Sequence, residues 1–148
     1  MQRILIATDG SDTALEAVDF GLDLAHGEGA DVTFLHVTLP IEWSVYPFGP
    51  LEALPDEAPT ADQDDALRVA MEHAAAKGVH ATPVSVLGDP VSEVTGYART
   101  MNADLIVVGS RGLGGVTSAL LGSVSKGILK HADRPVLVVR AAHAPVPA

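Results

Sequence analysis

The feature that most constrains this chain is a set of short apolar runs separated by stretches with helical spacing. Nearly continuous apolar runs occupy residues 4–7, 32–37, 105–108 and 136–139, and an alternating run occupies 82–87. Continuous runs indicate strands buried on both faces of a parallel sheet, whereas alternation and Pro83 indicate a strand at the sheet edge. Right-handed crossovers then predict an α/β fold: an open, doubly wound, Rossmann-like sheet of five parallel strands with helices on both faces.

The starts of the first two helices can be read from capping patterns. Apolar residues at 15, 18, 22 and 25 share one face of the first helix. Either Thr13 with Glu16 as a capping box, or Ser11 alone, is expected to cap it. The second helix is predicted to start at Thr60, with Gln63 as the capping partner.

Composition narrows the class of protein. Of the 148 residues, 47% are hydrophobic and 19% are charged, which excludes wholesale disorder. The net charge of -10 disfavours nucleic acid as a partner, because like charges repel. No apolar run approaches the roughly 20 residues of a membrane span, so no membrane insertion is expected. The absence of cysteine excludes disulfides and thiolate chemistry. These features predict a soluble cytoplasmic protein.

Residues 1–140 are predicted to form one domain. Residues 39–59 contain five prolines and no lysine or arginine, which indicates a long acidic loop within that domain. The six acidic residues between 52 and 65 are read as a solvated loop face. Residues 141–148 are expected to form a frayed tail.

Two glycine-containing segments suggest an anion site at the carboxyl end of the sheet. Gly109-Ser110-Arg111-Gly112 follows the fourth strand, and Gly122-Ser123-Val124-Ser125 comes where the last helix starts. Glycine lets backbone amides approach a phosphate, and a helix N-terminus attracts an anion. Either segment alone is better explained as a turn or a serine cap, but both together in a parallel sheet favour an anion site.

Two further residues lie at strand ends. Asp9, after the first strand, could accept a hydrogen bond from a ribose hydroxyl or hold Mg²⁺ through water, or it could be a turn residue that bonds its own backbone. His36 lies in an apolar strand and is expected to be a satisfied core residue. No Gly-Lys-Ser/Thr follows the glycines, which excludes a P-loop. No nucleophile is accompanied by a base, so the sequence predicts no catalytic residue and favours binding over catalysis.

The combination resembles the universal stress protein family over about residues 2–140. The resemblance rests on the segment from Ile4 to Ser11, on His36-Val37, on the signature Gly-x2-Gly-x9-Gly-Ser from Gly109 to Ser123, and on the closing run 135–139. This glycine signature marks the ATP-binding branch of the family.

The resemblance implies the strand order 3-2-1-4-5, a homodimer and a site for ATP or a related adenine nucleotide. Ala7, Thr8 and Asp9 would line the adenosine end, and Val37 would offer its backbone to the adenine. The ribose and phosphates would be wrapped by Val108, Gly109, Arg111 and Gly112. The phosphates would be bound by Gly122, Ser123, Val124 and Ser125.

Assembly is predicted at the fifth strand. In the order 3-2-1-4-5 this strand is an edge, and an uncovered apolar edge invites pairing. A two-fold dimer is therefore expected to form through Val136, Leu137, Val138 and Val139.

The resulting hypothesis is an ATP-binding regulatory protein of stress responses, with slow hydrolysis or none, that acts on a protein partner of unknown identity. Two alternatives remain open. One is an interaction module that works without nucleotide, and the other is a true ATPase or nucleotidyl-transfer enzyme.

Overall fold

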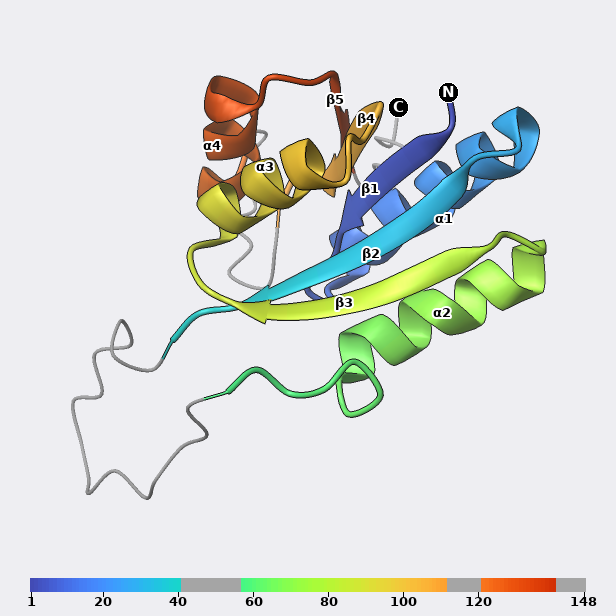
Figure 1. Ribbon diagram of the computed structural model, residues 1–148, viewed down its shortest axis with the longest axis horizontal. Coiled ribbons are helices and arrows are strands. Elements are labelled where there is room, and N and C mark those ends of the chain that lie inside the picture. Colours follow the sequence, from blue (N-terminus) through green and yellow to red (C-terminus); the bar gives the residue numbers. More distant parts are fainter. Residues whose placement is uncertain (41–56, 112–120, 141–148) are drawn as a thin grey trace, which may run out of the picture.

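The computed structural model describes residues 1–40, 57–111 and 121–140 (Figure 1). Its elements, in chain order, are β1 (Arg3–Ala7), α1 (Asp12–Glu28), β2 (Asp31–Thr38), α2 (Asp65–Lys77), β3 (Ala81–Leu87), α3 (Pro90–Thr100), β4 (Leu105–Gly109), α4 (Ser123–His131) and β5 (Val136–Val139). The central part of the predicted 39–59 loop, Gly112 and the predicted tail lie outside the described residues.

The five strands form one parallel sheet in the order β3-β2-β1-β4-β5. The predicted doubly wound α/β fold is therefore confirmed. β1 and β4 are neighbours at the centre of the sheet, and the strand order reverses between them. Ligands of open parallel sheets bind at such a point, beyond the carboxyl ends of the strands.

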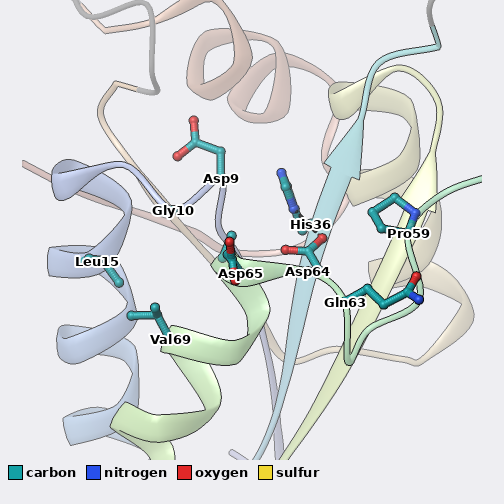
Figure 2. Close-up of a pocket in the computed structure, with 10 residues that line it drawn as sticks. Asp9, Gly10, Leu15, His36, Pro59, Gln63, Asp64, Asp65 and Val69 are labelled. Carbon is teal, nitrogen blue, oxygen red and sulfur yellow. Dashed lines mark hydrogen bonds and ion pairs between the residues drawn. The ribbon is translucent and has the colours of Figure 1, made fainter. Parts of the chain in front are cut away.

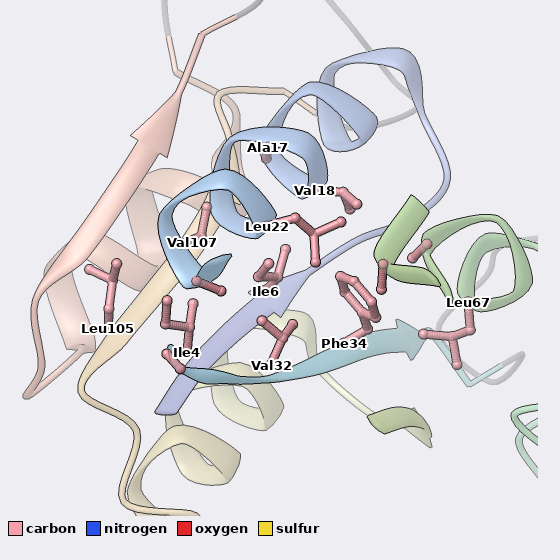
Figure 3. Packing of buried hydrophobic residues seen from close by; sticks show 14 residues of the cluster. Ile4, Ile6, Ala17, Val18, Leu22, Val32, Phe34, Leu67, Leu105 and Val107 are labelled. Atoms are coloured by element: carbon pink, nitrogen blue, oxygen red, sulfur yellow. The ribbon is translucent and has the colours of Figure 1, made fainter. Parts of the chain in front are cut away.

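Helices cover both faces of the sheet. On one face α1 and α2 pack over Ile4 and Ile6 of β1 and over Val32 and Phe34 of β2 (Figure 3). On the other face α3 and α4 pack over the intervening strand residues, such as Leu5 and Leu35. Alternate residues of β1 thus enter opposite cores, which is why its sequence is apolar without a break. The edge position of β3, with Pro83 paired to Phe34, confirms the expectation from its alternation.

The first helix begins at the second of the two predicted caps. The amide of Ala14 donates to the Ser11 hydroxyl at 3.3 Å, and α1 starts at Asp12. A capping box that begins at Thr13 is therefore wrong. Gly29 ends the helix with a left-handed backbone, φ 66°.

The predicted start of the second helix at Thr60 is also wrong. Residues 61–63 form a turn, in which the Gln63 amide donates to the Thr60 carbonyl at 2.9 Å. The helix begins at Asp65, because the Asp64 carboxylate accepts the Leu67 amide at 3.1 Å. Asp64 is buried, so this cap is fixed by the surrounding structure and not only by local sequence.

Replacing each of two glycines of α1 by alanine is expected to change the stability of the protein in opposite directions. A Cβ on Gly21 would lie 2.5 Å from Ile6 Cδ1, whereas a Cβ on Gly27 meets nothing within 4 Å. Ile6 is fully buried, so Gly21→Ala should overpack the core. The free energy of unfolding should fall by about 1 kcal/mol, even though alanine has the higher helix propensity. Gly27→Ala should gain about 0.5 kcal/mol. Urea unfolding of both variants measures this, and shifts of the same sign would contradict it.

Candidate functional site

The turn after β1 is held by its own side chains. The buried Thr8 donates its amide to the Leu35 carbonyl of β2 at 3.0 Å, and its hydroxyl accepts the Gly10 amide at 3.3 Å. The Asp9 carboxylate accepts the Ser11 amide at 3.0 Å. Gly10 has φ 80°, a backbone that favours glycine. The turn thereby fixes Asp9 at the carboxyl end of β1, next to the start of α1.

The two glycine segments predicted from sequence are brought together by one carbonyl group. The Ser110 carbonyl accepts the Gly122 amide at 2.7 Å and the Ser125 hydroxyl at 3.0 Å. The Ser110 amide in turn donates to the Val139 carbonyl at 2.8 Å, which ties this corner to β5. Ser125 is only 2% exposed, so its hydroxyl has a structural role at this joint.

The N-terminus of α4 differs from those of the other helices. Side chains of Ser11, Asp64 and Asp89 cap α1, α2 and α3. At Asp89 the Ser92 amide donates at 2.9 Å and holds the pKa of that carboxyl below its usual range. In contrast α4 begins after Gly122 with no side-chain cap. The exposed residues Ser123 and Val124 form the first turn, and amides in this turn can bind an anion.

Gly109 has a packing role besides its place in the glycine pattern. A Cβ on this residue would lie 3.0 Å from the Thr13 carbonyl oxygen and 3.1 Å from the Thr13 carbonyl carbon. Both atoms belong to the backbone of the first turn of α1. Glycine therefore lets the end of β4 approach the start of α1.

A cavity of about 460 Å³ opens between the ends of β1 and β2 and the helices α1 and α2 (Figure 2). It is lined by Asp9, Gly10, Leu15, His36, Pro59, Gln63, Asp64, Asp65, Ala66 and Val69. Leu15 of α1 and Val69 of α2 point toward each other and form an apolar part. The carboxylates of Asp9, Asp64 and Asp65 make the rest strongly acidic. Its volume lies within the range of about 300–1,000 Å³ that is usual for ligand pockets.

His36 has a hydrogen-bond partner, as predicted, but it is only half-buried and lines this cavity, so the expectation that it lies in the core is wrong. Its Nδ1 lies 2.6 Å from Asp64 Oδ2, and its side chain is 21% exposed whereas that of Asp64 is 3% exposed. Ser85 of β3 donates its hydroxyl to the same Asp64 oxygen at 3.4 Å. The prediction that the acidic run was wholly a solvated loop face is thus wrong at Asp64.

The remaining predicted site residues lie at the same end of the sheet. Ala7 is the last residue of β1, and Val37 is the penultimate residue of β2, on the face opposite the cavity. Val108 pairs with Val138 of β5, and the half-buried Arg111 follows two residues after β4 ends. The cavity and the glycine segments therefore flank the point where strand order reverses.

In the described part of the chain, no three or more His, Asp or Glu side chains form a group that could hold a metal ion. None of the helices in the described part of the chain is long and apolar enough to cross a membrane.

Comparison with known proteins decides the family. The model of the universal stress protein family matches residues 1–140. The chain belongs to the universal stress protein family. Universal stress protein YxiE of Bacillus subtilis is 34% identical, with 93% of this chain and 98% of the relative covered. Universal stress protein MJ0531 of Methanocaldococcus jannaschii is 35% identical, with 94% and 82% covered.

Solved structures, among them one of a universal stress protein, share the fold. A universal stress protein in complex with cAMP has a TM-score of 0.70 at 29% identity, with 94% of this chain and 96% of that chain covered. Hypothetical protein MJ0577 has a TM-score of 0.76 at 22% identity, with 97% and 98% covered. The five-stranded sheet described above is thus the universal stress protein fold.

Proposed function

We propose that this universal stress protein binds an adenine nucleotide, with ATP as the expected ligand, and acts as a regulatory protein of stress responses with slow hydrolysis or none. The observation that carries the proposal is the α4 N-terminus, which has no side-chain cap and adjoins the glycine segment after β4. The relative solved with cAMP, at 29% identity, adds support for an adenine nucleotide.

The proposed roles follow the strand ends. Ala7, Thr8 and Asp9 contact the adenosine, and Val37 offers backbone groups to the adenine. The ribose and phosphates are wrapped by Val108, Gly109, Arg111 and Gly112. The phosphates rest on Gly122, Ser123, Val124 and Ser125, where the first-turn amides of α4 supply the donors.

The charges around the site determine the orientation of a bound nucleotide. The cavity carries the carboxylates of Asp9, Asp64 and Asp65, which repel a phosphate. The α4 N-terminus attracts one through its amides and its helix dipole. The strands that carry His36 and Gly109 are separated only by β1, a span of roughly 10 Å. A mononucleotide can bridge this span with its base toward the cavity and its phosphates toward α4.

Further parts of the proposal concern the surroundings of the site. Asp9 holds Mg²⁺ indirectly, through bound water, when the metal arrives with the nucleotide. Residues 1–140 act as one nucleotide-binding domain in the cytoplasm. A protein partner, not nucleic acid, receives the signal, which agrees with the net charge of -10.

The test is to identify the ligand directly. Protein purified gently and denatured with acid is analysed by mass spectrometry for adenine nucleotides, and stripped protein is titrated with magnesium-ATP in a calorimeter. A co-purifying adenine nucleotide and saturable binding are expected. Absence of both would overturn the proposal. Phosphate release faster than about one per second would favour the enzyme alternative.

Assembly gives a prediction of its own. Among the described strands, β5 is a sheet edge that pairs with β4 alone, and its four residues are half-buried in the single chain. We propose a homodimer through Val136, Leu137, Val138 and Val139. Val138→Lys should weaken the dimer at least about tenfold, because it places an unpaired ammonium in the interface. Val84→Lys is the matched control, because Val84 lies in the opposite edge strand and packs, half-buried, against the same core cluster as Val138; it should leave the dimer intact. Sedimentation measures both, and a parent protein that is monomeric at micromolar concentration would contradict the prediction.

A further inference from the structure

The His36–Asp64 pair is not explained by the fold or by the proposed phosphate site. Asp64 caps α2 with one carboxylate oxygen, through the Leu67 amide at 3.1 Å. Its other oxygen lies 2.6 Å from His36 Nδ1 and accepts the Ser85 hydroxyl at 3.4 Å. The contacts of Asp64 with His36 and Ser85 are not needed to cap the helix. The pair therefore fixes the histidine ring at the cavity as well as starting the helix.

The pairing determines what the ring offers to a ligand. A carboxylate only accepts hydrogen bonds, so Nδ1 carries the hydrogen that points to Asp64. The neutral ring then has an acceptor lone pair at Nε2. Figure 2 shows this second nitrogen directed away from Asp64, on the side of the cavity where Asp9 lies. The ring keeps 21% of its side-chain surface exposed, so a ligand can reach it.

The polar groups beside His36 differ in what they offer. The Asp9 carboxylate also accepts hydrogen bonds, and the Gln63 amide can donate or accept. The Asp65 carboxylate is 93% exposed and pairs with Arg68. An amino group that enters the cavity is bound, whereas a carbonyl oxygen at the same place faces lone pairs. Leu15 and Val69 supply the apolar surface that a flat ring covers.

We infer that His36 is a specificity-determining residue that selects 6-aminopurine nucleotides over 6-oxopurine nucleotides by accepting a hydrogen bond from the ring amino group. Asp64 is its positioning residue, because it sets the tautomer. This inference rests on the proposed function and adds to it the reason for the choice of base.

The test compares AMP with IMP, which differ at the 6-position. Both affinities are measured by calorimetric titration in the same buffer. The parent protein should bind AMP about tenfold more tightly than IMP, the value of one hydrogen bond at a partly open site. Equal affinities, or a preference for IMP, would overturn the inference but leave the proposed function standing. Failure of AMP, IMP and magnesium-ATP alike to bind would overturn both the inference and the proposed function.

Asp64→Asn gives the sharpest outcome. Asparagine is as good an N-cap as aspartate, so α2 keeps its start. Its amide group donates to Nδ1, which moves the ring hydrogen to Nε2 and makes that nitrogen a donor. The preference should then reverse toward IMP, and the ¹⁵N shifts of His36 should report the changed tautomer. Asp65→Asn is the matched control, since it removes the same charge from an exposed neighbour in the cavity lining.

A second variant keeps the inference testable if Asp64→Asn does not fold. His36→Phe retains a flat ring of similar size but has no nitrogen. It should bind AMP and IMP with nearly equal affinity while still responding to Gly122→Asp, which acts at the phosphate end. An unchanged preference for AMP in His36→Phe, or in a folded Asp64→Asn, would overturn the role given to His36.

Discussion

Gly122→Asp is expected to reduce magnesium-ATP binding by more than about a hundredfold while the protein stays folded. Gly122 is the N-cap of α4, with φ -64° and ψ 162°, a backbone that any residue adopts. Aspartate is a preferred N-cap and would accept the first-turn amides that the phosphates are proposed to use. Its charge would also repel the phosphates. The same change that stabilises the helix end therefore removes the anion site.

The steric cost of this substitution is small. A Cβ on Gly122 would lie 3.3 Å from the Ser110 carbonyl oxygen, which requires a shift of only a few tenths of an ångström. Gly122→Asn is the matched control, because asparagine caps equally well but carries no charge. Its affinity should fall between those of the parent and the aspartate variant. Parent-like affinity of Gly122→Asp in calorimetry would show that the glycine signature does not hold phosphate.

The features of the fold that produce a regular pattern of apolar residues could be predicted from the sequence. The apolar runs of β1 and β4 and the alternation of β3 identified the central and edge strands, because burial on one face or two has a direct pattern in sequence. Glycines such as Gly29 and Gly78 are typical sequence signals of a helix end, since both have the positive φ that glycine permits.

The cavity could not be predicted, because it depends on contacts between distant residues. Asp64 lies 28 positions after His36, and only the β2–α2 arrangement brings them together. The acidic run therefore looked like a solvent-exposed face, and Thr60 looked like the better cap. Two signals were present: His36 shares a sheet face with Val32 and Phe34, and Asp64 lies three residues before the buried Leu67.

The glycine signature itself combines two physical requirements that sequence alone does not separate. Gly122 lies at a helix start with room for a short side chain, whereas Gly109 lies against the backbone of α1. The first position concerns what the site can bind. Gly109 concerns how closely β4 and α1 approach. A substitution there is expected to reduce the stability of the fold before it reduces ligand binding.

Gly109→Val is therefore expected to destabilise the protein by about 2–3 kcal/mol, which lowers Tm by roughly 5–10 °C. The new Cβ would lie 3.0 Å from the Thr13 carbonyl oxygen, and the two methyl groups beyond it add further overlap. Backbone cannot rotate away as a flexible side chain does, so the start of α1 must move as a unit. Urea unfolding at matched protein concentration measures the loss, since a dimer makes stability depend on concentration.

Gly96→Val provides the matched control for this last prediction. Gly96 lies within α3, and a Cβ there meets nothing within 4 Å, so its stability should change by no more than about 0.5 kcal/mol. Parent-like stability of Gly109→Val would show that the β4–α1 contact opens without cost. The glycine at 109 would then have to be explained by the ligand, as at 122. If instead Gly109→Val loses stability and Gly122→Asp loses nucleotide binding, the two ends of the signature serve different purposes. Gly109 allows β4 to pack closely on α1, and Gly122 leaves the first-turn amides of α4 available to an anion.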